Sequence, residues 1–290
     1  MGVGDDFKSF CSNLTIPLET RKTIGDRYQL ITKRLNLDFW SLDSNKDHSF
    51  YAGSYGRGTA TRGFSDLDMI FRLPYGVYEK YNNYVYNGQS ALLQEVRKSL
   101  QKTYSTTSIG GDGQVVAISF TDGITFEIVP AFVNKDGSYT YPDSNDGGRW
   151  RVTNPKPEIE SFMDSTVNGN LKWLCRMMRV WKNKWSVPMG GLLIDTLAYR
   201  FLRDWPDKDK SFLYYDWMTR DFLNFLSEEN FRDYWLAVGS SQYIFRKGDF
   251  QHKAKRCYNI SVEAINHATA GNTWSSKQKW REIYGSYYPA

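Results

Sequence analysis

The spacing of apolar residues changes several times along the first half of the chain. Over 18–40 apolar residues recur every three or four positions, which predicts a long amphipathic helix, and 89–104 repeats this spacing. The segment 49–74 has no helical period. It ends in the alternating run DLDMIFRLP, so a turn followed by a strand is predicted there.

Two further apolar runs, 114–120 and 124–133, flank the tripeptide Thr121-Asp122-Gly123. An Asp-Gly pair between such runs is typical of a hairpin turn, so two antiparallel strands are predicted. The following stretch, 134–154, is rich in Gly, Asp, Ser and Asn. We expect a surface loop there, with a lobe boundary near its end.

The second half of the chain has helical spacing. Asn154-Pro155 is a helix-entry signal, because proline fits the first helical turn without losing a hydrogen bond. This order of elements predicts an α+β fold, in which an α+β lobe (1–153) joins an α-helical lobe (154–290), with a ligand cleft between them. Helices are predicted at 157–165, 171–185, 191–204, 217–226, 230–238 and 251–268.

Composition narrows the class of protein. The chain has 290 residues, with 37 Lys and Arg against 32 Asp and Glu, and the net charge of +5 favours small anionic ligands over a dedicated nucleic-acid surface. No apolar stretch reaches about 18 residues, and the N-terminus lacks the apolar segment of a secretory signal. We therefore expect a cytoplasmic protein without a membrane span.

Cysteine and histidine contribute little chemistry. The three cysteines contain no CxxC pair, which argues against a disulfide framework or a zinc site and predicts buried free thiols. The three histidines are too scattered for a metal site or for histidine-based catalysis.

Carboxylates are the residues that point to chemistry. In a strand, Asp66 and Asp68 face the same way about 7 Å apart, and Leu67 faces the core. In the run TFEIVP, Glu127 lies on the polar face of its own strand and completes a three-carboxylate cluster if the two strands pair. Three such groups would repel one another without cations, so the pattern predicts a site for two Mg²⁺ ions, with Mn²⁺ as an alternative.

Gly53 and Ser54 precede this pattern in a short loop, where backbone and hydroxyl groups can approach a phosphate. A DxD at a strand end is by itself usually a solvated edge. The combination of Gly-Ser, DxD and a later FEIVPAF strand instead favours metal-assisted transfer from a nucleoside triphosphate.

The string GSYGRGTATRGFSDLD resembles the nucleotidyltransferase signature in which Gly-Ser is followed by a DxD, and FEIVPAF resembles the third-carboxylate strand of the oligoadenylate synthase and cyclic GMP-AMP synthase branch. Together with NPKPEIESF, LKWLCRMMRVWKNKW and WREIYGSYYP, the chain is similar over nearly its whole length to the bacterial cGAS/DncV-like nucleotidyltransferases. The resemblance implies a polymerase-β-like catalytic lobe with a mixed or antiparallel sheet and a helical lobe. It also implies Mg²⁺-dependent synthesis of a cyclic di- or trinucleotide second messenger in antiphage (CBASS-type) signalling.

The resemblance also assigns residues. Asp66, Asp68 and Glu127 would be the catalytic metal ligands, Gly53 and Ser54 would hold the donor triphosphate, and Lys182 matches a lysine that reaches triphosphate oxygens. Glu127 departs from the commoner Asp. The run Met189-Gly190-Gly191-Leu192 stands where relatives carry a Ser-Tyr pair that contacts the donor nucleotide.

Alternatives stay open at several positions. Lys182 and Lys184 are also consistent with the solvated face of a helix whose other face is core. Arg57 is consistent with phosphate binding and equally with pairing to the carboxylates near Asp66. The expected partners are nucleoside triphosphates and a downstream effector that reads the product. A monomer without a nucleic-acid activator is expected. The rival functions are a transferase that makes linear oligonucleotides and a catalytically silent nucleotide-binding regulator.

Overall fold

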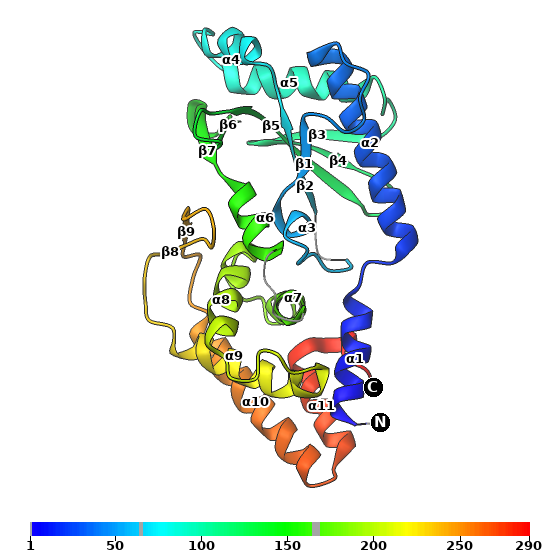
Figure 1. The fold of residues 1–290 in the computed structure, drawn as a ribbon, viewed down its shortest axis with the longest axis vertical. Coiled ribbons are helices and arrows are strands. Elements are labelled where there is room, and N and C mark those ends of the chain that lie inside the picture. Colours follow the sequence, from blue (N-terminus) through cyan, green and yellow to red (C-terminus); the bar gives the residue numbers. More distant parts are fainter. Residues whose placement is uncertain (1, 64–65, 164–168) are drawn as a thin grey trace. The chain divides into compact units, whose positions relative to one another are not determined.

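A computed structural model describes residues 2–63, 66–163 and 169–290 of the chain. The chain forms two compact units (Figure 1), and each is described by itself. We call them the sheet unit, made of Pro17–Arg57 and Ser65–Ile159, and the helical unit, made of Met1–Ile16, Gly58–Phe64 and Glu160–Ala290. The division into catalytic and helical lobes at 153/154 stays a prediction; the compact units group two N-terminal segments with the C-terminal half.

A mixed sheet forms the centre of the sheet unit. β2 and β5 are parallel, and the other strand pairs are antiparallel. The order is β1-β2-β5-β4-β3, with β6 pairing to β5 and to β7. This arrangement confirms the predicted α+β class. The strands are β1 (Ser49–Tyr51), β2 (Leu67–Arg72), β3 (Ser108–Asp112), β4 (Val115–Ser119), β5 (Thr125–Val133), β6 (Tyr139–Asp143) and β7 (Arg149–Thr153).

Two helices of the sheet unit form where apolar residues recur every three or four positions. Leu92, Leu93, Val96 and Leu100 are all buried, so the apolar face of α5 packs against the sheet, where it contacts β3, β4 and β6. Figure 1 shows α4 and α5 together above the sheet. The predicted helices at 18–40 and 89–104 are confirmed, whereas α3 and α4 were not predicted. These helices are α2 (Leu18–Trp40), α3 (Gly53–Gly56), α4 (Tyr75–Asn82) and α5 (Gly88–Gln101), and α6 (Pro155–Met163) begins in this unit.

The predicted hairpin between β4 and β5 is confirmed. Gly123 has a positive φ of 84°, a backbone conformation that glycine adopts without strain. Its N–H donates to the Phe120 carbonyl at 3.0 Å, and the Phe120 N–H donates to the Ile124 carbonyl at 2.9 Å. Arg27 of α2 forms an ion pair with Asp122 at 2.8 Å, which ties the helix to the turn.

The prediction of a surface loop over 134–154 is wrong. Residues 139–153 of this segment form the antiparallel hairpin of β6 and β7, whose two strands are joined by a 3₁₀ turn at Asn145–Gly147. Most of the Asn, Asp and Gly residues that suggested a loop belong to the turns, whereas Asp143 lies in β6. β6 buries Tyr139 and Asp143, and neither β6 nor β7 has the regular alternation of buried and exposed residues by which a strand is predicted.

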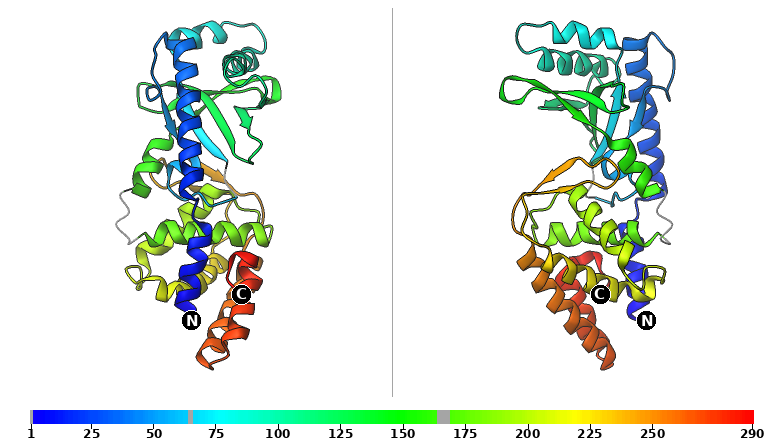
Figure 2. Two further views of the ribbon diagram at one scale, coloured as in Figure 1. Left: turned by 90° about the vertical axis from the view of Figure 1, so that its right-hand side faces the viewer. Right: turned by 60° about the vertical axis from the view of Figure 1, so that its left-hand side comes forward.

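The helical unit contains most of the predicted helices and two that were not predicted. Its core includes the buried indoles of Trp181, Trp235 and Trp280. The views in Figure 2 show α10 and α11 side by side, in agreement with their contacts. Residues 164 and 165 of the predicted helix 157–165 lie outside the described residues. The helices are α1 (Val3–Leu14), α7 (Asn170–Lys184), α8 (Gly191–Asp204), α9 (Tyr215–Glu228), α10 (Gln251–Thr269) and α11 (Thr273–Tyr284).

The predicted helix at 230–238 is wrong. This segment contributes β8 (Tyr234–Leu236), which pairs with β9 (Tyr243–Phe245) in a separate hairpin. Trp235 is buried while Tyr234 and Leu236 on either side are exposed, so the burial has the period of two that is typical of a strand.

Two expectations about composition can be compared with the structure. Cys11, Cys175 and Cys257 are all buried free thiols, as predicted. None of the described helices combines the length and the apolar character needed to cross a bilayer.

Candidate active site

The parallel pairing of β2 with β5 places two of the predicted site residues beside each other. Asp68 and Glu127 are direct register partners, although they are 59 positions apart in the sequence. Leu67 and Met69 are buried on β2, and Phe126 and Ile128 are buried on β5. Because side chains alternate across a strand, the same registers turn both carboxylates to the opposite face. The two strands therefore pair, as the predicted carboxylate cluster requires.

These carboxylates repel one another. The pKa of Glu127 is raised, first by burial and then by the negative charges of Asp68, Asp66 and Asp112. The pKa of Asp68 is also raised by burial and by Asp66, although the positive charge of Arg57 acts in the other direction. Asp66, the exposed residue before β2, is therefore electrostatically coupled to both partners.

Asp112 is an acidic residue that the sequence analysis missed. It is exposed at the end of β3, and β3 was not predicted because SIGGD contains two glycines. Its charge acts on Glu127 across the sheet, where β4 lies between β3 and β5. Only the strand order could reveal this neighbour.

The donor chemistry of this cluster suits a divalent cation. Carboxylate oxygens are the ligands that Mg²⁺ prefers, and a cation would relieve the repulsion that raises both pKa values. As the side chains stand, no group of three or more His, Cys, Asp or Glu among the described residues is arranged to hold a metal ion. Asp68 and Glu127 thus form a paired centre, and coordination by Asp66 as a third ligand stays a prediction.

Gly53 lies against Asp68. It begins the four-residue helix α3 with a positive φ of 53°, and a Cβ at this position would overlap the Asp68 carboxylate. The preceding Ala52 N–H donates to the Asp68 carbonyl at 2.8 Å. The structure therefore explains the glycine by the close approach of Asp68. Ser54, the next residue, is half-buried, and its predicted role toward phosphate stays a prediction.

The surroundings of Arg57 favour one of the two roles that the sequence left open for it. Its side chain is buried and forms an ion pair with Glu158 of α6, with 3.4 Å between Nη1 and Oε2. The same charge partly offsets the rise in the pKa of Asp68 that burial causes. Both observations favour pairing with carboxylates over phosphate binding.

Lys182 belongs to the helical unit. It lies in the last turn of α7, where Leu174, Met177, Met178 and Trp181 form the buried stripe, and it is half-buried whereas Lys184 is exposed. The pKa of Lys182 is lowered, first by burial and then by the positive charges of Lys247 and Arg179. The contacts described for this part of the chain include no hydrogen bond or ion pair of the Lys182 ammonium.

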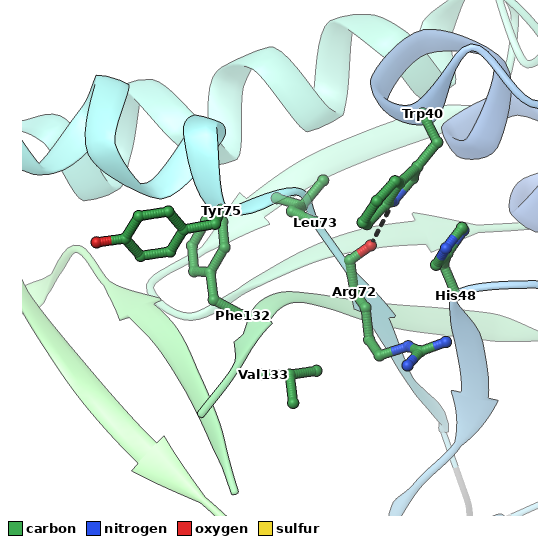
Figure 3. Close-up of a pocket in the computed structure, with 7 residues that line it drawn as sticks. All are labelled: Trp40, His48, Arg72, Leu73, Tyr75, Phe132 and Val133. Carbon is green, nitrogen blue, oxygen red and sulfur yellow. Dashed lines mark hydrogen bonds between the residues drawn. The ribbon is translucent and has the colours of Figure 1, made fainter. Parts of the chain in front are cut away.

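A separate pocket of about 290 Å³ lies at the other end of β2 (Figure 3). The Trp40 indole donates to the Arg72 carbonyl at 2.8 Å and stacks on His48 at a ring distance of 3.9 Å. Arg72 ends β2, so the pocket lies about 13 Å along the strand from Asp68. It is thus distinct from the carboxylate pair. Its lining residues are Trp40, His48, Arg72, Leu73, Tyr75, Phe132 and Val133.

Comparison with known families decides the family of the chain. The model of the Second Messenger Oligonucleotide or Dinucleotide Synthetase domain, SMODS, matches residues 1–165, which is more than half of the sequence. The chain belongs to the SMODS family. The predicted resemblance to bacterial cGAS/DncV-like nucleotidyltransferases is thereby confirmed, and this SMODS protein is a nucleotidyltransferase of the cyclic oligonucleotide synthase class.

Solved structures with similar folds include several enzymes of this class. Escherichia coli MS115-1 CdnC, solved in complex with HORMA-deltaN, is 14% identical with a TM-score of 0.70, and the match covers 99% of this chain and 98% of CdnC. Bradyrhizobium diazoefficiens CdnG in complex with GTP is 9% identical with a TM-score of 0.70, and the match covers 98% of this chain and 95% of CdnG. Vibrio cholerae DncV is 16% identical with a TM-score of 0.65, and the match covers 83% of this chain and 69% of DncV. At these identities the likeness shows the fold, and no curated protein matches the sequence.

Proposed function

We propose that this SMODS protein is a Mg²⁺-dependent synthase, with Mn²⁺ as an alternative, that joins nucleoside triphosphates into a cyclic di- or trinucleotide and releases pyrophosphate. The family description, a synthetase of second messengers, supports this proposal, as do the nucleotides named for CdnG with GTP and CdnC with ATP. In the proposal the product signals phage infection to a downstream effector, and the reaction takes place in the cytoplasm, where nucleoside triphosphates are abundant.

The proposed residue roles are those that the family resemblance implies. Asp66, Asp68 and Glu127 would hold the cations, and Gly53, Ser54 and Lys182 would bind the triphosphate. When bound, two divalent ions activate an attacking hydroxyl and stabilise a pyrophosphate leaving group. The chain itself supplies negative ligands from two adjacent strands and a positive charge from α7. The observation that carries the proposal is the register pairing of Asp68 with Glu127, with Asp66 coupled to both.

Product analysis of the Asp68→Asn variant tests the proposal. The protein is incubated with the four labelled ribonucleoside triphosphates and Mg²⁺ or Mn²⁺, and the phosphatase-treated products are identified by mass spectrometry. We expect wild type to form a phosphatase-resistant cyclic product and Asp68→Asn to lose at least about a hundredfold in pyrophosphate release, because half of the central carboxylate pair is gone.

A matched control uses Asp26→Asn, which neutralises an exposed aspartate of α2 in the same unit and should leave activity unchanged. Thermal melting of all three proteins establishes that they fold. Undiminished turnover in Asp68→Asn would refute the metal-site assignment. Products with phosphatase-sensitive ends would show a linear synthase instead, and no turnover by wild type with any triphosphate would show a silent regulator.

A further inference from the structure

The hairpin β8–β9 of the helical unit has one buried face and one exposed face. Trp235 is 1% exposed and packs its indole against Phe250, whereas Tyr243 and Phe245 on the opposite face are 61% and 67% exposed. The alternation continues past β9, where Arg246 turns inward and Lys247 turns outward. Lys247 therefore shares the exposed face with Tyr243 and Phe245.

Contacts within the hairpin hold Lys247 in place. The Arg246 N–H donates to the Asp233 carbonyl at 2.8 Å, which extends the ladder by one residue. The Arg246 guanidinium pairs with Asp249 and lies 4.1 Å from the ring centre of Phe231. Lys247 thus extends from an anchored segment rather than from a free loop.

Lys247 reaches the loop that follows α7. Its Cε lies 3.9 Å from the position of a Cβ at Gly190, and the neighbouring Gly248 packs on Pro188. The same loop is tied to Lys182, whose carbonyl accepts the Val187 N–H at 2.8 Å. The two lysines are close enough for the charge of Lys247 to lower the pKa of Lys182.

Among the described residues, no acidic side chain is paired with either of these two lysines. In the parts of the chain that the structure describes, neither ammonium forms a hydrogen bond or an ion pair. Arg179, the other cation that acts on Lys182, is matched by Asp195 at 2.5 and 2.9 Å. Two like charges held together, one of them half-buried, are unfavourable unless an anion lies between them.

We infer that Lys247 is a second phosphate-binding lysine, which together with Lys182 binds the phosphate chain of a nucleoside triphosphate. The inference rests on the proposed function, in which Lys182 is the lysine that binds phosphate. The exposed rings of Tyr243 and Phe245 beside Lys247 favour a ligand that carries an aromatic base next to its phosphates. A bare inorganic anion would leave these rings unused.

Calorimetric binding of ATP, tripolyphosphate and adenosine to the full chain tests this assignment. We expect Lys247→Ala to bind ATP and tripolyphosphate roughly tenfold more weakly, because a charge-assisted hydrogen bond to phosphate is lost. The variant should bind adenosine as wild type does. Lys247→Arg, which keeps the charge, should restore most of the ATP affinity. Lys184→Ala is the matched control, because Lys184 is an exposed lysine of the same unit.

Two results separate this inference from the proposed function. If wild type binds ATP and makes product, and Lys182→Ala weakens ATP binding while Lys247→Ala does not, the role of Lys247 is overturned and the proposed function stands. If wild type neither binds ATP nor makes product, both are overturned. An equal loss of adenosine binding in Lys247→Ala would also overturn the phosphate role, because it would indicate a structural effect on the hairpin.

Discussion

Two carboxylate sites of the same sheet differ in how their charge is balanced. On β6, the buried Asp143 accepts hydrogen bonds from Arg151 at 2.5 Å, from Arg149 at 3.4 Å and from the backbone of Asn145 at 3.1 Å. Burial acts to raise its pKa, but these hydrogen bonds outweigh it and lower the pKa to about 2. On β2 and β5, Asp68 and Glu127 face each other and both pKa values are raised.

The helical unit shows the same contrast with cations. Arg179 and Asp195 form a buried two-pronged ion pair, and Thr59 donates to the same carboxylate at 2.8 Å. Lys182 and Lys247 instead repel each other. Matched charges are typical of structural support, whereas like charges held together are typical of a site whose balance comes from a ligand. By this reasoning the charges of the carboxylate pair and of the lysine pair would be balanced by the proposed cations and the proposed phosphates, respectively.

The largest expected effect comes from breaking the matched pair of the helical unit. Asp195→Asn leaves the Arg179 guanidinium buried without its counter-charge and should lower the free energy of unfolding by about 3–5 kcal/mol. Chemical denaturation monitored by circular dichroism measures this loss. The double variant Arg179→Met/Asp195→Leu should recover much of it, because both charges are removed together. A single variant as stable as wild type would contradict a structural role for the pair.

A smaller effect is expected at Asp143, and it depends on pH. Because the pKa of Asp143 in the folded protein, about 2, lies below its ordinary value of 3.8, its contribution is fully present above pH 4 and is lost as the pH falls toward 2. Asp143→Asn should therefore cost about 1–2 kcal/mol at pH 7. The two melting temperatures should converge as the pH falls from 4 to 2. A constant difference across that range would contradict the ion-pair explanation.

The smallest expected effect has the opposite sign. Glu127→Gln removes a charge whose described electrostatic neighbours are all acidic, so in EDTA the variant should melt about 1–3 °C above wild type. Added Mg²⁺ should raise the melting temperature of wild type and leave that of the variant nearly unchanged. Glu79→Gln, an exposed residue of α4, is the control and should respond to Mg²⁺ as wild type does. An unaltered Mg²⁺ response in Glu127→Gln would place the metal ligands elsewhere.

Local patterns predicted much of the fold. The helices at 18–40 and 89–104 and the Asp-Gly hairpin follow from residues a few positions apart, since helical and turn preferences act over short distances. The errors have local causes as well. Turn residues hid β6 and β7, and the segment 230–238 was predicted as a helix where the chain forms β8. α1 carries Phe7, Phe10, Cys11 and Leu14 on one buried stripe, a signal that was present in the sequence and was missed.

The sequence by itself determined which carboxylates lie on the polar face of their strands, because side-chain alternation is local, and it determined the family through recognisable motifs. Only the tertiary structure decided that β2 and β5 pair in parallel with Asp68 opposite Glu127, that Asp112 adds its charge, and that Lys247 lies beside Lys182. Asp68 and Glu127 are 59 positions apart in the sequence and Lys182 and Lys247 are 65 apart, whereas Asp112 and Glu127 are 15 apart and act across the intervening β4. Such pairings depend on how whole elements bury their apolar faces against one another, which no short stretch of sequence encodes.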